Sequence, residues 1–307
     1  MSFIKWVGGK SKLIPQIQPK IISYPNVENY LEPFLGSASV LISLLKSKDN
    51  KFKNFKANDI NKDLITTFNV VKHNPKQLIY SLRQISSKYQ KASDKELFYY
   101  KCRDVYNDKY LRDEDESCVF LDENGLLDIN DDIHSTPSQI YQDLLRATLF
   151  IFLNKTCFRG LYRVNKQDEF NVPFGNYMKP TIFNEDEIME ISNLIQNVEF
   201  YNEDYRTFLD KFKTKNSVIY LDPPYFGTFN GYSSKDFNHD EFVNYCKNLV
   251  GDDEDDKEIH LVISNSKQFY DKYEDELRGF DVSFVDINER MNSKSPNSIR
   301  NEVILTK

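Results

Sequence analysis

Cysteine is scarce in this 307-residue sequence, and its four residues, Cys102, Cys118, Cys157 and Cys246, form no C-x-x-C pair. Such scattered cysteines argue against a zinc site or a disulfide framework and favour reduced thiols. Long hydrophobic runs are also missing, since none approaches the ~20 residues of a membrane span. Residues 1–6 contain no hydrophobic signal region. We therefore expect a cytoplasmic protein without a membrane segment and without a metal.

An excess of positive charge is lacking as well, because the formal net charge is −7. Residues 111–132 hold nine acids and one arginine, and residues 251–258 hold six acids and one lysine, so the rest of the chain is basic. The two acidic segments can simply be solvated loops. They still leave room for a basic groove that binds nucleic acid.

The most informative motif is Asp222-Pro223-Pro224-Tyr225, which follows an apolar run at residues 217–221. That run predicts a buried parallel strand, and open α/β sheets bind ligands at the carboxyl ends of such strands. We interpret the motif as an amine clamp (residues 222–225) for an exocyclic aromatic amine. The Asp222 carboxylate and the Pro223 carbonyl would each accept one N–H and localise the nitrogen lone pair. The prolines restrict the backbone, and Tyr225 offers a ring for stacking. The alternative is a plain strand-ending turn.

Glycine is sparse where a nucleotide would bind. The loop that follows a short strand at residues 30–31 holds one glycine, Gly36, whereas dinucleotide sites have three. Its strand–loop–helix pattern, with Glu32 at the strand end, is nevertheless typical of an adenosine-type cofactor site. Asp59 follows a second predicted strand and is placed to accept both ribose hydroxyls, or else it caps the next helix. Asp204, after a strand near residue 198, could accept a hydrogen bond from the cofactor adenine.

Two other segments suggest ligand contacts. Gly8 and Gly9 would let the backbone approach a ligand, with the charge of Lys10 following, although a flexible N-terminal turn is an equal alternative. Residues 154–177 predict a β-hairpin that turns around residues 165–168. We call residues 154–177 the basic–aromatic segment. In it and just after it, basic side chains, which suit phosphates and base edges, alternate with aromatic side chains, which suit unstacked bases. They are Lys155, Arg159, Arg163, Lys166 and Lys179, and Phe158, Tyr162, Phe170, Phe174 and Tyr177. A solvated hairpin packed on the preceding helix is the alternative.

The remaining pattern alternates helices and strands. A helix begins near residue 11, two amphipathic helices occupy residues 75–110, and further helices cover 140–154, 184–194 and 237–250. Strands are predicted at 260–266, 280–285 and 302–305. Residues 226–238 and 290–300 predict mobile loops, the first of them a lid.

Together these parts resemble the Dam-type family of DNA adenine-N6 methyltransferases over nearly the whole chain. The matching motifs, in order, are Lys5-Trp-Val-Gly-Gly-Lys10, Glu32-Pro-Phe-Leu-Gly36, Asn58-Asp59-Ile-Asn61, Gly160-Leu161-x-Arg163, Glu169-Phe-Asn-Val-Pro-Phe-Gly175, Asp222-Pro-Pro-Tyr225 and Ile263-Ser-Asn265. The resemblance implies an α/β, Rossmann-like S-adenosylmethionine-dependent methyltransferase fold. Residues 1–72 and 181–307 would form the catalytic domain. Residues 73–180 would form an inserted, mainly helical target-recognition domain that carries the hairpin and an acidic insertion near residues 111–138.

The resemblance also implies roles for residues. Asp222, Pro223, Pro224 and Tyr225 would hold a flipped adenine of double-stranded DNA, possibly in GATC or a related short palindrome, and the enzyme would act as a monomer or weak dimer. Asp222 would also border the S-adenosylmethionine site, whose other residues would be Trp6, Gly9, Lys10, Glu32, Phe34, Gly36, Asp59 and Asp204. DNA would be contacted by Lys155, Phe158, Arg159, Leu161, Arg163, Asn176 and Tyr177, with Phe158 as a wedge.

Three departures from the family pattern leave alternatives open. Ala38 stands where the family loop has a second glycine, and its methyl group should narrow the cofactor pocket. Arg159 and Asn176 replace an Asn and an Arg of GATC-methylating relatives, so the target sequence is uncertain. Two rival hypotheses also stay open: an RNA base methyltransferase, since Asp-Pro-Pro-Tyr also serves exocyclic amines in RNA, and a non-catalytic DNA-binding module, which only Ala38 favours.

Overall fold

The computed structural model describes residues 3–107, 139–227, 237–250, 259–289 and 298–307. Both acidic segments, most of the predicted lid and most of the second predicted loop lie outside the described residues. The chain forms two compact units, each considered by itself below. The sheet unit comprises Lys10–Ile60, Asn197–Asn230 and Lys235–Lys307, and the helical unit comprises Met1–Gly9 and Asn61–Gln196. The predicted recognition domain, residues 73–180, lies inside the helical unit.

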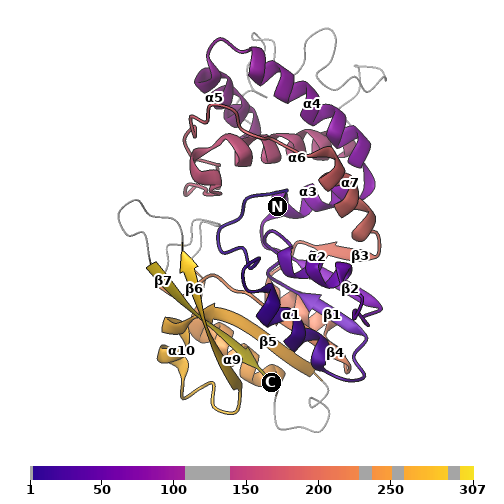
Figure 1. The fold of residues 1–307 in the computed structure, drawn as a ribbon, viewed down its shortest axis with the longest axis vertical. Coiled ribbons are helices and arrows are strands. Elements are labelled where there is room, and N and C mark those ends of the chain that lie inside the picture. The colour runs from indigo at the N-terminus through magenta and orange to yellow at the C-terminus, as the bar shows by residue number, and fades with distance from the viewer. Residues whose placement is uncertain (1–2, 108–138, 228–236, 251–258, 290–297) are drawn as a thin grey trace. The chain divides into compact units, whose positions relative to one another are not determined.

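The sheet unit is built on one seven-stranded sheet with the order β3-β2-β1-β4-β5-β7-β6 (Figure 1). Neighbouring strands from β3 to β5 pair in parallel, whereas β7 runs antiparallel to both β5 and β6. The strand order reverses between β1 and β4, which is the point where open α/β sheets bind ligands. The strands are β1 (Asn29–Glu32), β2 (Asn54–Asn58), β3 (Val198–Tyr201), β4 (Ser217–Leu221), β5 (Ile259–Ser266), β6 (Asp281–Glu289) and β7 (Ser298–Thr306).

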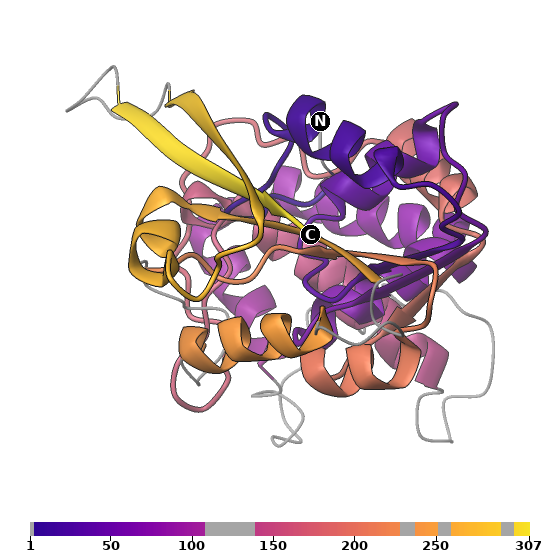
Figure 2. The same ribbon diagram turned by 90° about the horizontal axis from the view of Figure 1, so that it is seen from below.

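The predicted central strand is confirmed: every residue of β4 is buried, and it pairs in parallel with β1 and β5. Helices cover both faces of the sheet (Figure 2). On one face, side chains of α8 (Tyr205–Phe212), α9 (His239–Leu249) and α10 (Lys267–Tyr273) pack with β1, β4, β5 and β7 in one hydrophobic core. On the other face lie α1 (Ile14–Ser23) and α2 (Ser39–Lys46).

The helical unit contains five of the ten α-helices found in the described residues, together with a short 3-10 turn. The longest helix described in this unit is α6, and its residues 147–156 are all buried, so this part of the helix has no solvent-facing side. Tyr89 and Phe98 pack edge-on against Phe152 of that helix. The elements are α3 (Lys62–His73), α4 (Pro75–Lys91), α5 (Lys95–Tyr106), α6 (Gln139–Thr156), η1 (Phe158–Gly160) and α7 (Glu185–Leu194).

Three sequence predictions need correction. The predicted hairpin reverses direction as expected, since Asn165 N–H donates to the Glu169 carbonyl, but it forms only isolated antiparallel bridges, Cys157 with Phe174 and Val164 with Phe170. Arg300 lies in β7 rather than in a loop. The first helix begins at Ile14, not near Ser11. Helices α8 and α10 were not anticipated.

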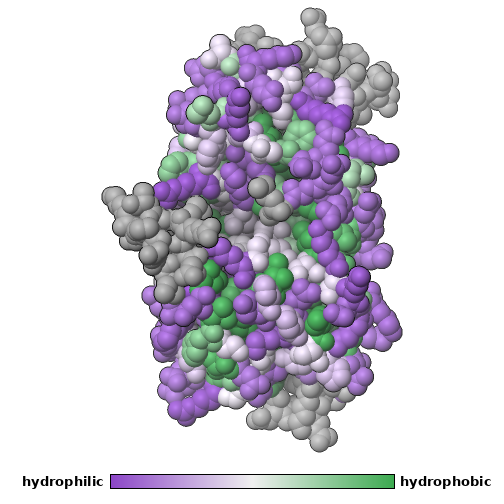
Figure 3. All heavy atoms as spheres, viewed as in Figure 1, coloured by the Kyte–Doolittle hydropathy of each residue, from purple (hydrophilic) through white to green (hydrophobic). Residues whose placement is uncertain are grey.

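The described surface is largely hydrophilic on the face drawn in Figure 3, with hydrophobic side chains in separate patches. Among the described residues, no helix is long and apolar enough to cross a membrane.

Candidate active site

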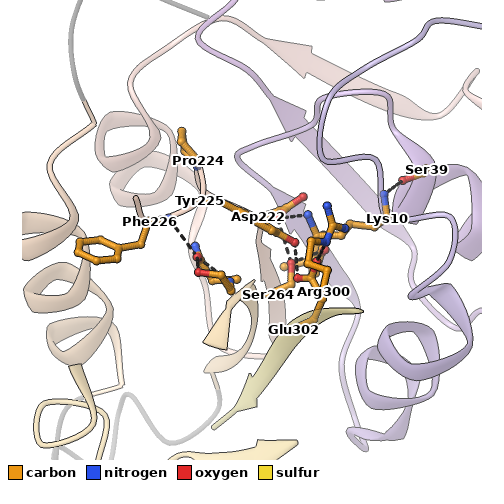
Figure 4. Close-up of polar contacts among 12 residues, drawn as sticks. Lys10, Ser39, Asp222, Pro224, Tyr225, Phe226, Ser264, Arg300 and Glu302 are labelled. Carbon is orange, nitrogen blue, oxygen red and sulfur yellow. Dashed lines mark hydrogen bonds and ion pairs between the residues drawn. The ribbon is translucent and has the colours of Figure 1, made fainter. Parts of the chain in front are cut away.

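The predicted amine clamp leaves the carboxyl end of β4, beside the ends of β1 and β5. Asp222 follows Leu221 directly, and its side chain turns toward two polar groups of the sheet unit (Figure 4). The Lys10 Nζ atom lies 2.6 Å from Asp222 Oδ1, and the Ser264 hydroxyl donates to the same oxygen at 3.0 Å. Tyr220 supports Ser264 through a hydroxyl–hydroxyl bond of 2.8 Å. One carboxylate oxygen is therefore fixed from two directions.

The charge of Asp222 depends on these neighbours. Burial raises the pKa of its carboxyl above the usual value, while the Lys10 ammonium, the Ser264 hydroxyl and the Arg300 guanidinium oppose that rise. Lys10 is itself only 2% exposed, so water screens the pair little. The arrangement keeps a carboxylate available as an acceptor in a mostly buried position.

The backbone of the clamp is anchored by α9 and β5. His239 Nε2 lies 2.8 Å from the Pro224 carbonyl, and because a carbonyl can only accept, this nitrogen carries a proton. Burial lowers the pKa of His239, so the ring is neutral near pH 7. The Asn265 side-chain oxygen accepts from Phe226 N–H at 3.3 Å. The turn is thus held on both sides of Tyr225.

Tyr225 lies within a group of charges. The Lys10 Nζ atom is 4.5 Å and the Arg300 guanidinium carbon is 5.5 Å from the centre of its ring. Its hydroxyl donates to Glu302, a residue of β7. Cations at these distances are attracted to the electron-rich face of an aromatic ring, and this attraction holds the Tyr225 ring beside Lys10 and Arg300.

The loop after β1 connects to the end of β2. Gly36 N–H donates to Asp59 Oδ2 at 2.9 Å, and Gly36 adopts a positive φ of 50°. The alternative that Asp59 caps the next helix is wrong, because the Asn61 side chain accepts from Leu64 N–H and caps α3. Ala38, at the start of α2, also has a positive φ of 57° and is fully buried. An alanine thus adopts the left-handed conformation that suits a glycine.

Glu32 ends β1 and is buried. Its Oε2 accepts from the Tyr30 hydroxyl at 2.7 Å. Burial raises the pKa of the Glu32 carboxyl to about 8, and the negative charges of Asp222 and Asp59 add to that rise while the Tyr30 hydrogen bond opposes it. Near neutral pH the side chain is therefore mostly protonated, and a cation placed beside it would favour the ionised form.

Two neighbouring acids follow β3. Asp204 caps α8 by accepting from Arg206 N–H, and its carboxylate also accepts from the Arg206 guanidinium at 2.9 and 3.2 Å. Partial burial raises the pKa of Asp204, but the bonds from Arg206 outweigh it, and the pKa falls below its usual value. The neighbouring Glu203 has a buried Oε2 with no hydrogen-bond partner in the described part of the chain.

Phe34, the remaining predicted cofactor residue of the sheet unit, packs against aromatic rings. Its ring centre lies 5.3 Å from that of Tyr205, 5.8 Å from Phe237 and 6.0 Å from Phe242. These contacts fix the loop after β1 to the helices on one face of the sheet.

Trp6 and Gly9 belong to the helical unit, so their predicted place beside a cofactor stays a prediction. The Trp6 indole stacks on Tyr162 with 5.5 Å between ring centres and 28° between planes. The neighbouring Lys5 exchanges two hydrogen bonds with the Asn154 side chain, of 2.8 and 2.7 Å. Gly9 N–H donates to the Trp6 carbonyl. The N-terminal residues are therefore packed onto the basic–aromatic segment.

Most of the predicted DNA-contacting side chains lie on the surface of the helical unit. Phe158 is 45% exposed, and the Arg159 guanidinium lies 5.2 Å from its ring centre. Arg163 Nε donates to the Asn171 side chain at 2.7 Å. Lys155, in contrast, is buried, and burial lowers the pKa of its ammonium to about 8. Leu161 is half-buried, Asn176 is exposed, and Tyr177 lies under the Lys5 ammonium at 4.8 Å.

Sequence reasoning missed two residues that support the clamp, Glu302 and His239. The sequence contained a hint of Glu302, because this acid directly precedes the apolar run Val303–Leu305. It contained no hint of His239, since this residue reaches Pro224 only through the start of α9. In the described residues, no group of three or more His, Cys, Asp or Glu side chains could hold a metal ion.

Comparison with known proteins is consistent with this geometry. A sequence model of the D12 class N6 adenine-specific DNA methyltransferases matches residues 6–292. The type II methyltransferase M.MjaIII of Methanocaldococcus jannaschii is 33% identical over 302 residues, covering 95% of this chain and 93% of that protein. The DNA adenine methylase of Haemophilus influenzae is 31% identical over 270 residues, covering 86% of this chain and 78% of that protein.

The DNA adenine methylase of Escherichia coli K12 is also similar, with 30% identity over 224 residues, 73% of this chain and 64% of that protein. The family match extends over most of the chain and includes the clamp, the loop after β1 and the basic–aromatic segment. The chain therefore belongs to the D12 class of N6 adenine-specific DNA methyltransferases, which methylate adenine in DNA at specific sites.

Proposed function

We propose that the amine clamp receives a target adenine flipped out of double-stranded DNA, with its N6 held by Asp222 and the Pro223 carbonyl and its ring stacked on Tyr225. The observation that carries this proposal is the buried contact of Lys10 and Ser264 with one oxygen of Asp222 at the end of β4. Flipping costs a few kcal/mol, which stacking and backbone contacts offset.

The clamp acts on the nitrogen lone pair. In adenine this pair is delocalised into the ring, so N6 is a poor nucleophile. Two acceptors placed on its two N–H groups stabilise N6 as it becomes tetrahedral, and these hydrogen bonds strengthen toward the transition state. S-adenosylmethionine, when bound, would supply the methyl group as an electrophile and would keep the electrons of the broken methyl–sulfur bond, and one N6 proton would pass to the Asp222 carboxylate or to water. Because the turn is anchored by His239 and Asn265, the acceptors are positioned before the base arrives.

The cofactor that fits this unit is S-adenosylmethionine, which supplies an electrophilic methyl group on a positively charged sulfur. The acids Glu32, Asp59 and Asp204 at the ends of three neighbouring strands form a set of acceptors that suits hydroxyl, amine and ammonium donors. We assign Asp59 to the ribose of the cofactor and Asp204 to its adenine. For Asp204 to bind the adenine, its hydrogen bonds from the Arg206 guanidinium would have to break. The loop residues Phe34 and Gly36, together with Trp6, Gly9 and Lys10, complete the proposed set.

Sequence recognition is assigned to the basic–aromatic segment. Exposed Phe158 would wedge into the base stack, and Arg159, Leu161 and Arg163 would contact bases, with Asn176 and Tyr177 alongside. Lys155 is buried, which supports a structural role better than a phosphate contact. The proposed target is GATC or a related short palindrome, and the enzyme would act as a monomer or weak dimer on DNA.

The test is to methylate an unmodified plasmid in vitro with labelled S-adenosylmethionine and to map every modified adenine. We expect N6-methyladenine within one short palindrome and no incorporation into a transcript of the same sequence. Incorporation into RNA in preference to duplex DNA would contradict the proposal. Modified adenines in unrelated contexts would overturn the assigned recognition role of the basic–aromatic segment.

A further inference from the structure

Glu302 is an acid in an unusual position. It is the middle residue of β7 and the first residue of that strand that pairs with β5. Because β7 runs antiparallel to β5, Glu302 lies opposite Ser266, at the carboxyl end of β5. The side chain is fully buried, and apolar residues follow it. Burying a carboxylate costs free energy unless partners compensate, so a strand that otherwise forms core gains no stability from an acid here.

The Glu302 side chain contacts Tyr225 of the amine clamp and Arg300, which lies beside the Tyr225 ring. Glu302 Oε2 accepts from the Tyr225 hydroxyl, and Oε1 lies 2.5 Å from Arg300 Nε, an ion pair outside hydrogen-bond geometry. Burial raises the pKa of the Tyr225 hydroxyl, which therefore keeps its proton and donates it to Glu302. Burial also raises the pKa of Glu302, and the Tyr225 hydrogen bond and the Arg300 charge oppose that rise. Arg300 lies two residues earlier in the same strand and is partly exposed. Figure 4 shows Arg300 and Glu302 beside Asp222 and Lys10.

This network controls the orientation of one ring. A tyrosine attached to a turn can rotate about its side-chain bonds, and a hydrogen bond at the far end of the ring removes that freedom. Arg300 and Lys10 lie 5.5 and 4.5 Å from the ring centre, so the charges that surround the ring are held in place as well. A base that stacks on Tyr225 needs a ring whose plane is already set.

We propose that Glu302 is a positioning residue for methyl transfer, which fixes the ring plane of Tyr225 through its hydroxyl and holds Arg300 beside that ring. The inference rests on the proposed role of Tyr225 as the stacking surface. A purely structural role for Glu302 makes a different prediction, because loss of the residue would then change stability without any link to the Tyr225 hydroxyl.

A double-mutant cycle separates the two roles. The variants are Glu302→Leu, Tyr225→Phe and their combination, with Glu302→Gln as a conservative variant whose amide oxygen can still accept. Asn301→Ala, at the exposed neighbouring position of β7, is the matched control. The measurements are the single-turnover rate of methyl transfer to a duplex with one target site, the KM for that duplex, and the affinity for S-adenosylmethionine by calorimetry.

We expect Glu302→Leu to lower the transfer rate about 30-fold, because it leaves the Tyr225 hydroxyl without its acceptor. Glu302→Gln should lose less than about 5-fold, and the double variant should be no slower than Glu302→Leu alone, because the two residues act through one contact. Cofactor affinity and the Asn301→Ala rate should stay within about twofold of wild type.

Rates that multiply in the double variant would overturn the proposal, as would a loss of cofactor affinity that equals the loss of rate. If Glu302→Leu does not fold, Tyr225→Phe alone decides the question, because it removes the hydroxyl that Glu302 binds: its transfer rate should fall with cofactor affinity unchanged, and a rate within about twofold of wild type contradicts the proposal. Failure of this inference leaves the proposed function intact, because replacement of Asp222 tests the clamp independently of the Tyr225 hydroxyl.

Discussion

The sheet unit and the helical unit hold their candidate functional side chains in opposite ways. In the sheet unit, Glu32, Asp59 and Asp222 stand at or directly after strand ends, and each has a defined partner. In the helical unit, the basic–aromatic segment has only isolated bridges, and its backbone takes positive φ values at Arg159 and Asn176.

This difference fits the two proposed roles, methyl transfer in the sheet unit and DNA recognition by the basic–aromatic segment. Reacting groups need fixed geometry, and a parallel sheet provides it through the backbone of several strands at once. A recognition segment whose shape depends on individual side-chain contacts can change its sequence, and hence its target, without disturbing the sheet. The departures of this chain from the family pattern at Arg159 and Asn176 fall in that segment.

The first prediction concerns a substitution that disturbs the basic–aromatic segment and leaves the sheet unit unchanged. A methyl group added at Gly175 would lie 2.6 Å from the Cys157 carbonyl oxygen and 2.7 Å from that of Thr156. Because backbone would have to move, we expect Gly175→Ala to lower the free energy of unfolding by about 3 kcal/mol and duplex affinity at least 10-fold. Denaturant unfolding and fluorescence anisotropy with labelled duplex would measure both.

The control for that variant is Gly227→Ala in the sheet unit, where the nearest atom that an added methyl group would meet among the described residues is Gln268 Oε1 at 3.3 Å. It should cost only about 1 kcal/mol, from the positive φ at that position. Equal DNA affinity for Gly175→Ala and wild type would show that the shape of the segment does not determine recognition.

The second prediction concerns the buried acid of the sheet unit. Glu32 has a pKa of about 8, above its usual value of 4.5, so its contribution to stability is complete below pH 4.5 and is lost as the pH rises through 8. Glu32→Gln mimics the protonated form. We expect the variant to gain on the order of 2 kcal/mol over wild type between pH 5 and pH 9. Denaturant unfolding of both proteins across that range measures the difference in their free energies of unfolding. A difference that does not change with pH would contradict the raised pKa of Glu32.

The smallest expected effect concerns Ala38. Its positive φ of 57° costs an alanine about 1 kcal/mol relative to glycine. Ala38→Gly should therefore raise the free energy of unfolding by 0.5 to 1 kcal/mol, roughly. Thermal unfolding would show this as a higher midpoint, whereas a lower midpoint would mean that packing of the buried methyl group outweighs the backbone strain.

The sequence predicted the sheet well because its strands are short apolar runs with polar residues after them. The position of β4 and the three acids at the ends of β1, β2 and β3 could be read in this way. Contacts that join distant parts of the chain could not be predicted, since no local pattern encodes them. Examples are the pairing of Lys10 with Asp222 and the approach of His239 to Pro224.

The misassigned residues share a physical reason. Arg300 looked like part of a loop because the residues before it are polar, yet pairing with β6 extends β7 back to Ser298. The expected hairpin strands did not form because other hydrogen bonds replace the ladder. The backbone N–H groups of residues 167 and 169 donate to the Asn165 side chain, and that of Phe170 donates to the Asn107 side chain. In both cases long-range contacts, the pairing of β6 with β7 and the bond between Asn107 and Phe170, contribute to overriding local propensity.

The central claim is that Asp222 activates the adenine amine and does not merely hold the cofactor. The most direct measurement compares Asp222→Ala with wild type in single-turnover methyl transfer and in S-adenosylmethionine binding by calorimetry, with exposed Asp275→Ala as control. The account predicts a rate at least about 1000-fold lower and a cofactor affinity within about threefold of wild type. Methyl transfer by Asp222→Ala at a rate near that of wild type would contradict it.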